Sequence, residues 1–424
     1  MAWITTLVIL IGPGLLSILY FAGLAAGLGP QPWPVLVFSI AASLAAWWKL
    51  RPASPVPSDE SWNWLLLAAL AVAAIFVVLD AQTAAAANPT GEWDASGIWN
   101  MRARFLTHAD TWRRAISTEP GSFLAEISHP AYPLFLSGFV AALWSAAGTY
   151  SAAVPAWFSI AAALGVLILL VTSVGPRSGA LAGLILTATA YFASQASAQY
   201  SDLLLAFAFL AALTMLDTAR DRPALIACGL AIGLAPWIKN EGQPFAIAAL
   251  AVAVWRFRAG SVWVALGAVP GFAATLALKL MSDGRESMFP ATVAQALERA
   301  ADPARWFQVA AGFATAIRDA GPWWAHPVLL AIAVMATAGF LPRSEIRSRL
   351  WLAIPLAATF AAEFGIYVIT SSDLAWHLST SVTRLFLQLW PATLWFAFSL
   401  LRAPIAPPPA EIKRAKRKKQ PALS

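Results

Sequence analysis

Two carboxylates, Glu92 and Asp94, lie two residues apart in a long polar segment that follows an apolar run. A carboxylate that water can reach is able to take a proton from a hydroxyl or an amine, so each is a candidate general base. Asp94 also precedes a segment in which Ile98 and Phe105 recur on one helical face, and aspartate is a good N-cap. The local sequence therefore leaves both helix capping and catalysis open for Asp94.

Four further charged residues stand where polar segments meet apolar runs. Asp202 is followed at once by leucines, and a charge at a membrane edge is tolerated when it faces a wet cavity. Lys239 and Glu241 lie between two apolar runs, and Arg384 begins the last one. Ammonium and guanidinium groups bind phosphate, so the two cations are candidate phosphate ligands. The alternatives are a plain helix cap at Asp202 and a lysine that only snorkels to the membrane surface.

Two histidines adjoin these segments. His129 lies in the stretch Ser128-His129-Pro130-Ala131-Tyr132-Pro133, where the prolines predict an extended turn. A ligand, a base or an ordinary loop residue are all open for His129, and the loop role is favoured because no carboxylate pattern adjoins it. His377 lies in another polar segment shortly before Arg384. We take His129, Tyr132 and His377 as candidate substrate-binding residues.

Composition tells which elements must position these residues. The chain has 424 residues, of which 59% are hydrophobic and only 12% are charged. A soluble domain usually carries about 25% charged residues, so this chain needs lipid as its solvent. The segments 3–21, 65–79 and 152–174 contain no charge, and the first lacks the features of a cleavable signal peptide. The lone Cys228 excludes an internal disulfide and a cysteine-based metal site.

The apolar runs predict an all-α, polytopic helical membrane protein with about 12 transmembrane helices, at ~20 residues for each crossing. Two long polar segments, 84–131 and 281–325, interrupt the runs, and the first is expected to hold an interfacial helix. The expected spans are 3–22, 33–50, 62–83, 152–174, 178–196, 202–219, 223–238, 243–257, 261–280, 326–341, 350–370 and 383–402.

Lysine and arginine in the short loops predict the orientation, because cytoplasmic loops of membrane proteins carry an excess of both. Placing these basic loops and the basic tail at 403–424 inside puts both termini in the cytoplasm. The same choice puts 84–131, 197–201, 239–242, 281–325 and 371–382 outside. We therefore expect a bacterial-type inner or plasma membrane protein with its site on the periplasmic or extracellular face. The tail is typical of a segment near anionic lipid, so no nucleic-acid partner is expected.

One apolar segment, 134–147, breaks this count of crossings. It is short for a crossing, and a full crossing there would reverse the side of every later basic loop. We expect it to lie at the outer interface or to dip into the membrane and return.

The order of these elements resembles the GT-C superfamily of membrane glycosyltransferases. These enzymes use polyprenyl-phosphate sugars as donors, and they include the protein O-mannosyltransferases and the lipid A aminoarabinose transferases. The resemblance covers about residues 60–260 and the late Arg384 segment. It is carried by the acids of the first outer loop, by Trp99, Arg102 and Arg104 after them, by His129-Pro130 with Tyr132-Pro133, and by Tyr200-Ser201-Asp202.

This sequence departs from the family pattern in two places. Glu92 and Asp94 are separated by one residue, whereas the protein mannosyltransferases have an adjacent Asp-Glu pair, so which acid is the base stays open. The N-terminal pair of apolar runs is an addition, and only 281–325 stands in place of the family's large soluble C-terminal domain. The expected organisation is an N-terminal helix pair at 1–60, a GT-C-like catalytic domain at 61–402 and a basic cytoplasmic tail at 403–424.

The resemblance implies a donor sugar on a polyprenyl phosphate and an acceptor glycan, lipid or protein. Lys239 and Arg384 would bind the phosphate, Asp94 or else Glu92 would be the general base, and Asp202 would orient the acceptor or assist the base. Glu241, Trp99 and Arg102 join the histidines and Tyr132 as expected substrate-binding residues. Some relatives need a divalent metal at the acidic residues, but no compact metal-ligand spacing is present, so we assign no metal and no other cofactor.

Two other functions are compatible with the same segments. A transporter or flippase for lipid-linked sugars predicts charges near the bilayer midplane and repeat symmetry, whereas the charged residues here stand at span ends. An O-antigen ligase or polymerase usually has a large late outer loop rich in arginine and histidine. The segment 281–325 has arginines but no histidine before the adjoining His326.

Overall fold

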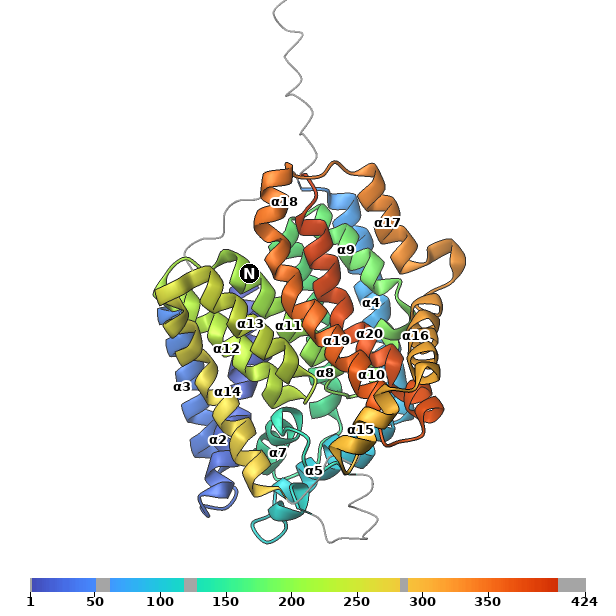
Figure 1. Cartoon of the computed structure of the whole chain (residues 1–424). Coiled ribbons are helices and arrows are strands. Elements are labelled where there is room, and N and C mark those ends of the chain that lie inside the picture. The colour runs from blue at the N-terminus through green and yellow to red at the C-terminus, as the bar shows by residue number, and fades with distance from the viewer. Residues whose placement is uncertain (1, 51–61, 118–127, 283–288, 403–424) are drawn as a thin grey trace, which may run out of the picture.

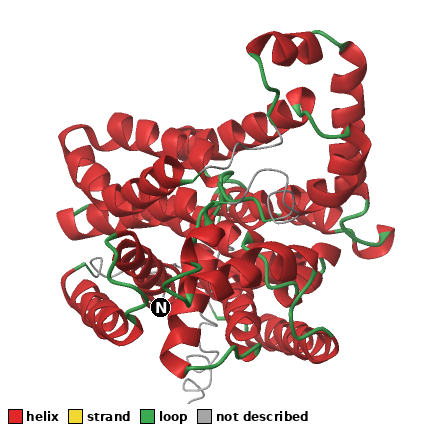
Figure 2. Cartoon of the chain, turned by 90° about the horizontal axis from the view of Figure 1, so that it is seen from below, coloured by secondary structure: helices red, strands yellow, loops and turns green. Residues whose placement is uncertain are grey.

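A computed structural model describes residues 2–50, 62–117, 128–282 and 289–402. Within these ranges every regular element is a helix, and one isolated bridge joins Phe340 to Leu401 (Figures 1 and 2). The all-α prediction is therefore confirmed. The apolar segments fold as helices because only a helix satisfies its own backbone hydrogen bonds inside lipid.

Five helical segments in the described ranges are long and apolar enough to cross a membrane, and up to seven if each of two bent pairs counts as one. The protein is therefore membrane-embedded, but the expected number of spans, near 12, is not confirmed. Several helices are shorter than the ~20 residues that a crossing needs, such as α11 (Asp202–Thr218) and α12 (Arg222–Ile238), with 17 residues each. The five segments are Ala2–Ala25, Trp64–Ala87, Ala153–Val174, Gly242–Met281 and Arg343–Ile369.

Two of the expected elements are broken by sharp bends. The run 178–196 folds as α9 (Ser178–Thr187) and α10 (Ala190–Ser197), which meet at 75°. The polar segment 281–325 holds two helices, α15 (Val293–Ala300) and α16 (Pro303–Arg318), and α16 meets the segment Trp323–Thr337, which contains α17 (Pro327–Thr337), at 74°.

The first helical segment belongs to the core. It consists of α1 (Ala2–Thr6), a π-helical turn (Leu7–Ile11) and α2 (Gly12–Ala25). Tyr20 on α2 donates to the carbonyl oxygen of Leu106, and Ser17 donates to that of Leu134. The apolar segment 134–147 forms α7 (Phe135–Ala147), most of which is buried, and α7 packs against α2 and against α5 (Asn100–Leu106). Its place relative to the membrane stays a prediction.

The remaining long helices complete the bundle. Small residues bring two of them, α12 and α14 (Ser261–Met281), into backbone contact. A Cβ atom at Gly229 would overlap the carbonyl oxygen of Val264, and one at Gly271 would overlap that of Gly233. Close packing of small residues is a common way to join helices in membranes, and here it fixes the end of α12 that carries Lys239. The other long helices are α3 (Pro32–Lys49), α4 (Trp64–Ala87), α8 (Ala153–Val174), α13 (Gly242–Phe257), α19 (Ala353–Ile369) and α20 (Leu374–Ser399).

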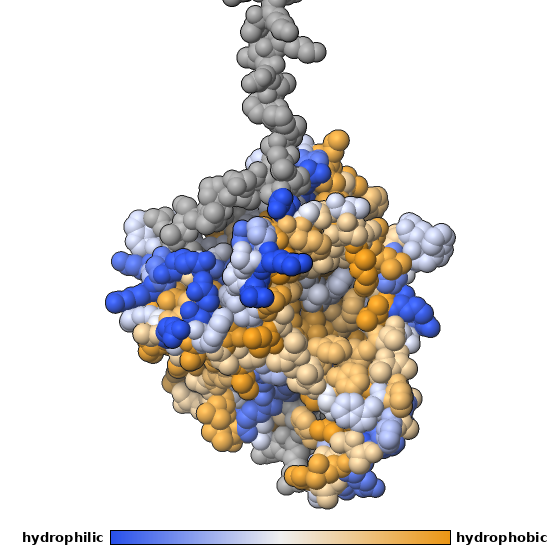
Figure 3. Space-filling model, turned by 45° about the horizontal axis from the view of Figure 1, so that its top comes forward, coloured by the Kyte–Doolittle hydropathy of each residue, from blue (hydrophilic) through white to orange (hydrophobic). Residues whose placement is uncertain are grey.

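Segments expected on opposite sides of the membrane lie at opposite ends of the bundle. The basic helix α18 (Arg343–Arg349), expected inside, is at the top of Figure 1, and α5 and α15, expected outside, are at the bottom. Apolar residues cover much of the face in Figure 3, and hydrophilic side chains gather in separate patches. Which end faces the cytoplasm stays a prediction.

Candidate functional site

Charged residues from four distant parts of the chain meet in one cluster. Asp94 precedes the π-helical turn Ala95–Trp99, and Asp202 begins α11. Lys239 and Glu241 occupy the turn between α12 and α13, and Arg384 lies within α20. These groups, expected on the outer side from the topology, thus lie in contact with one another. The side of the membrane on which they meet stays a prediction. We call these five residues the ion-pair cluster.

Arg384 joins the two aspartates. Its Nη1 atom lies 2.6 Å from Oδ2 of Asp94, and its Nη2 atom lies 3.2 Å from Oδ2 of Asp202. The guanidinium also stands over the ring of Tyr200, with Cζ 4.6 Å from the ring centre. Two carboxylates and an aromatic face hold the guanidinium in one orientation, because its planar fork of donors allows little freedom once both sides are engaged.

Asp202 is completely buried, and its side chain serves the cluster rather than the helix end. Its Oδ1 atom lies 3.0 Å from Nζ of Lys239 and accepts a hydrogen bond from Nε2 of Gln388. The helix that it begins receives no side-chain cap. The plain-cap interpretation of Asp202 is therefore wrong. A buried carboxylate is stable only when it is paired and hydrogen-bonded in this way.

Lys239 is buried between Asp202 and Glu241, and its Nζ atom lies 2.7 Å from Oε1 of Glu241. Burial opposes the charged form, but the two neighbouring carboxylates prevail and hold the pKa of Lys239 above its usual value. Lys239 therefore does not snorkel to the surface. Three carboxylates face two cations, so with every group ionised the cluster carries a net charge of −1.

Asp94 and Glu92 have different environments. Asp94 makes no side-chain cap, and its half-buried carboxylate is held by Arg384. Glu92 is exposed. The capping interpretation of Asp94 is therefore wrong, and Asp94 is the acid of this loop that belongs to the ion-pair cluster. The helix expected after it is present as the π-helical turn and α5.

Hydrogen bonds join the loop that carries Asp94 to the segment that precedes Asp202. The backbone N–H of Asp94 donates to the hydroxyl of Tyr200, at 3.1 Å, and burial raises the pKa of Tyr200 to about 12, so this hydroxyl stays neutral. Gln199 accepts from Asn100, at 2.8 Å, and donates to the carbonyl oxygen of Pro89. Gln199 is buried and has a φ of 61°, which is uncommon for a residue with a side chain. One short segment thus places both aspartates.

Four other predicted residues form a second cluster, next to α5. Arg102 is fully buried and donates to the carbonyl oxygens of Ala115, Pro130 and Tyr132. The ring of Tyr132 stacks on His129, with centres 4.7 Å apart, and on Trp99, with centres 5.9 Å apart. These contacts tie the turn before α7 to α5. Contact of these four residues with substrate stays a prediction.

Sequence reasoning named His377 and Arg384 but missed that they belong to one polar stripe on α20, and it missed the partner of that stripe on α19. His377, Ser381, Arg384 and Gln388 recur at three- and four-residue steps, and so share one face of α20. Tyr367 on α19 bonds to the hydroxyl of Ser381, at 2.7 Å, and its ring lies 4.5 Å from that of His377. The helical spacing of these polar residues was a signal visible in the sequence.

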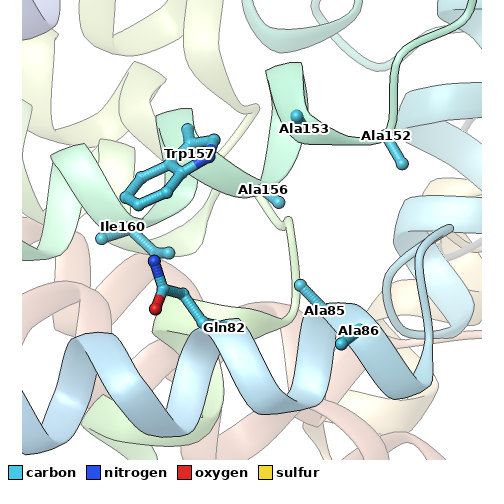
Figure 4. A pocket seen from close by; sticks show the side chains of 8 residues that line it. All are labelled: Gln82, Ala85, Ala86, Ala152, Ala153, Ala156, Trp157 and Ile160. Carbon is cyan, nitrogen blue, oxygen red and sulfur yellow. The ribbon is translucent and has the colours of Figure 1, made fainter.

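The described residues contain no group of three or more His, Cys, Asp or Glu side chains that could hold a metal ion. A pocket of about 210 Å³ lies between the end of α4 and the start of α8. Alanines of both helices border it, with Trp157, Ile160 and Gln82 grouped at one end (Figure 4). A much smaller pocket, between α8, α7 and the Gln199-Tyr200 segment, includes Pro155, Ser159 and Tyr200.

No protein-family model, curated protein or solved structure matched this chain. The resemblance to the GT-C superfamily therefore rests on the residues quoted from the sequence.

Proposed function

We propose that this protein is a membrane glycosyltransferase that moves a sugar from a polyprenyl-phosphate donor to an acceptor on the non-cytoplasmic face. The observation that carries the proposal is the pairing of Asp94 and Asp202 with a single arginine, Arg384. It brings together three of the segments that resemble the GT-C superfamily, namely the first outer loop with Asp94, the segment that ends at Asp202 and the late segment with Arg384. The acceptor is a glycan, a lipid or a protein that offers a hydroxyl or an amine.

Asp94 is the proposed general base. Its carboxylate is partly exposed, whereas that of Asp202 is completely buried, so an acceptor can reach only the first of the two. The acceptor oxygen or nitrogen attacks the anomeric carbon while the bond from that carbon to the phosphate oxygen breaks. The proton of the acceptor passes to Asp94, and the phosphate leaves on the polyprenyl chain with inversion at the sugar.

The roles of the two cations differ. Lys239 is buried between two carboxylates, so it holds the cluster together, whereas the partly exposed Arg384 is better placed to meet the donor phosphate. When Asp94 takes a proton, Arg384 loses one of the two carboxylate charges that hold it and keeps its pair with Asp202. The Nη1 side of the guanidinium can then turn to the leaving phosphate and neutralise it, so proton transfer and departure are coupled.

The donor's prenyl chain needs an apolar site beside the ion-pair cluster. The alanine-lined pocket between α4 and α8 is the candidate for this site, because α8 also lines the small pocket that includes Tyr200, the residue stacked on Arg384. This arrangement favours entry of the lipid from the α4 side of the bundle.

A second candidate function is transport of a lipid-linked sugar without chemistry. One observation favours it, since Glu363 is a buried acid within α19, and ionisable groups inside a membrane segment often mark transport pathways. A transporter would move the intact donor across the membrane of a vesicle and leave the sugar–phosphate bond unbroken. Recovery of only unchanged donor would support transport over transfer.

The experiment that tests the proposed function is the substitution Asp94→Asn. Asparagine keeps the shape but cannot accept the proton, so transfer should fall by ~10²–10⁴-fold. The measurement is sugar transfer by purified protein from polyprenyl-phosphate donors. Glu92→Gln is the matched control, and because Glu92 is exposed it should lose far less. Near-normal transfer by a well-folded Asp94→Asn protein would remove Asp94 as the base.

A further inference from the structure

Glu363 is the one acid of α19 and lies outside the ion-pair cluster. Its residue is only 2% exposed, and neither carboxyl oxygen has a hydrogen-bond partner among the described residues. Asp202, the acid of the ion-pair cluster that is buried to this degree, is satisfied, since it pairs with both cations. An unsatisfied buried carboxyl group is costly, so its presence requires an explanation.

The surroundings of Glu363 connect it to the candidate site. Helix α19 packs along α13, whose first turn follows Glu241, and Glu363 is close enough to Glu241 and Lys239 to interact with them electrostatically. Tyr367 lies one helical turn further along α19 and contacts His377. The Nδ1 atom of His377 also lacks a partner among the described residues.

Glu363 and Nδ1 of His377 are thus two hydrogen-bonding groups without a partner among the described residues. A carboxyl group and an imidazole nitrogen are complementary to hydroxyl groups, and the ring of Tyr367, one turn from Glu363, packs against that of His377. A site built to bind a hydroxyl rejects a ligand without one, because its buried polar groups are then left unpaired.

We propose that Glu363, with His377, forms a subsite for the hydroxyl groups of the donor sugar. This inference rests on the proposed function, and it assigns to α19 and α20 the recognition of the sugar, while Arg384 meets the phosphate. Glu363 is then a specificity residue whose bonds are completed only when the sugar is bound.

The test compares Glu363→Met, which fills similar volume without a polar group, with Glu363→Gln, which keeps one acceptor oxygen. Because no protein partner is lost, Glu363→Met in detergent should unfold at the same temperature as the wild type or higher. A clearly lower unfolding temperature would show that the fold needs this carboxyl, and would overturn the proposal.

The ligand measurement uses bare polyprenyl phosphate and the same lipid bearing glucose, mannose or arabinose. Glu363→Met should bind the bare lipid as the wild type does, and should lose ~10–100-fold in affinity for the sugar-bearing lipid that the wild type prefers. Glu363→Gln should lose less. Equal loss for both lipids, or no loss for either, would overturn the subsite.

The failure of the subsite and that of the proposed function give different results. If the wild type binds bare polyprenyl phosphate but gains nothing from any of the three sugars, the subsite is wrong and the donor lipid class stands. If the wild type binds none of these lipids, the donor class of the proposed function is wrong, and the subsite that depends on it is overturned as well.

Discussion

The helix pairs α12–α14 and α19–α20 share one apolar bundle but are joined in opposite ways. The first pair has glycines at its contact, and the backbones touch. In the second pair, Tyr367 of α19 contacts Ser381 and His377 of the polar stripe of α20. Small residues let the first pair pack backbone to backbone, whereas the second pair meets through polar side chains, which require partners.

The difference separates a contact that can only stabilise the fold from one that has the polar groups which the proposed chemistry requires. A dry glycine contact has no polar group to satisfy and can do no acid–base work. The polar pair carries groups that the fold satisfies only in part, as at Glu363, and such groups are usual at functional sites. Helix α11 lies between the two regions, since it packs against both α12 and α20.

Asp202 on α11 joins the two regions. Replacing its carboxylate should have the largest effect on stability and on transfer. It bonds to Lys239 at the end of α12 and to Arg384 on α20. Removing one partner of a buried ion pair typically costs about 3–5 kcal/mol, so Asp202→Asn should lower the unfolding temperature in detergent strongly and abolish transfer. The control is Asp319→Asn, which breaks an exposed pair with Arg318 and should change neither. Equal unfolding temperatures for the two variants would contradict the assigned role of Asp202.

One substitution made in each helix pair sharpens the comparison. Gly271→Ala places a methyl group against the backbone of Gly233, and overpacking of this kind costs about 1–3 kcal/mol. Gly365→Ala on α19 meets no atom within 4 Å, and alanine stabilises a helix by about 0.4–1 kcal/mol through the unfolded chain. The unfolding temperatures should therefore move in opposite directions. A Gly271→Ala protein as stable as the wild type would mean that the α12–α14 contact is looser than described.

Much of the ion-pair cluster could be predicted from the sequence. A charge beside a long apolar run is so costly that it must lie at a helix end or find a partner, so the topology alone places Asp94, Asp202, Lys239 and Arg384 together. What the sequence could not give is the pairing. From the sequence, Lys239 is expected to bind a phosphate group. In the structure its ammonium group already pairs with Asp202, which is distant in the chain.

The number of spans and the role of Glu363 could not be predicted for a different reason. Apolar content marks a run as membrane-compatible, but the bend at Thr189, where the backbone is extended, depends on the packing around it. Glu363 stands alone in an apolar run, and periodicity does not say whether a lone acid finds a partner. The polar stripe of α20 was detectable, because its spacing is helical.

The smallest expected effect concerns Gln199. Its side-chain hydrogen bonds to Asn100 and Pro89, called the Gln199 clasp, hold the loop that carries Asp94 in place beside Arg384 of α20. Gln199→Gly adopts the positive φ with ease but loses both side-chain bonds, and Gln199→Asn tolerates that φ but has a shorter amide that cannot span both partners. Since a hydrogen bond contributes about 0.5–1.5 kcal/mol, each variant should fold and lose about two- to tenfold in transfer.

A distance measurement gives a readout for Gln199 that does not depend on activity. Spin labels at Trp93, 66% exposed, and Trp376, 60% exposed, report the Asp94 loop and the start of α20 after Cys228 is replaced by alanine. The distance distribution should broaden in both Gln199 variants, because the loop is then held to its neighbour by fewer bonds. A Gln199→Leu variant, which keeps the bulk but not the bonds, should broaden it as well. If the distribution stays as narrow in Gln199→Gly as in the wild type while transfer falls, the clasp does not position Asp94, and the loss must come from elsewhere in the site.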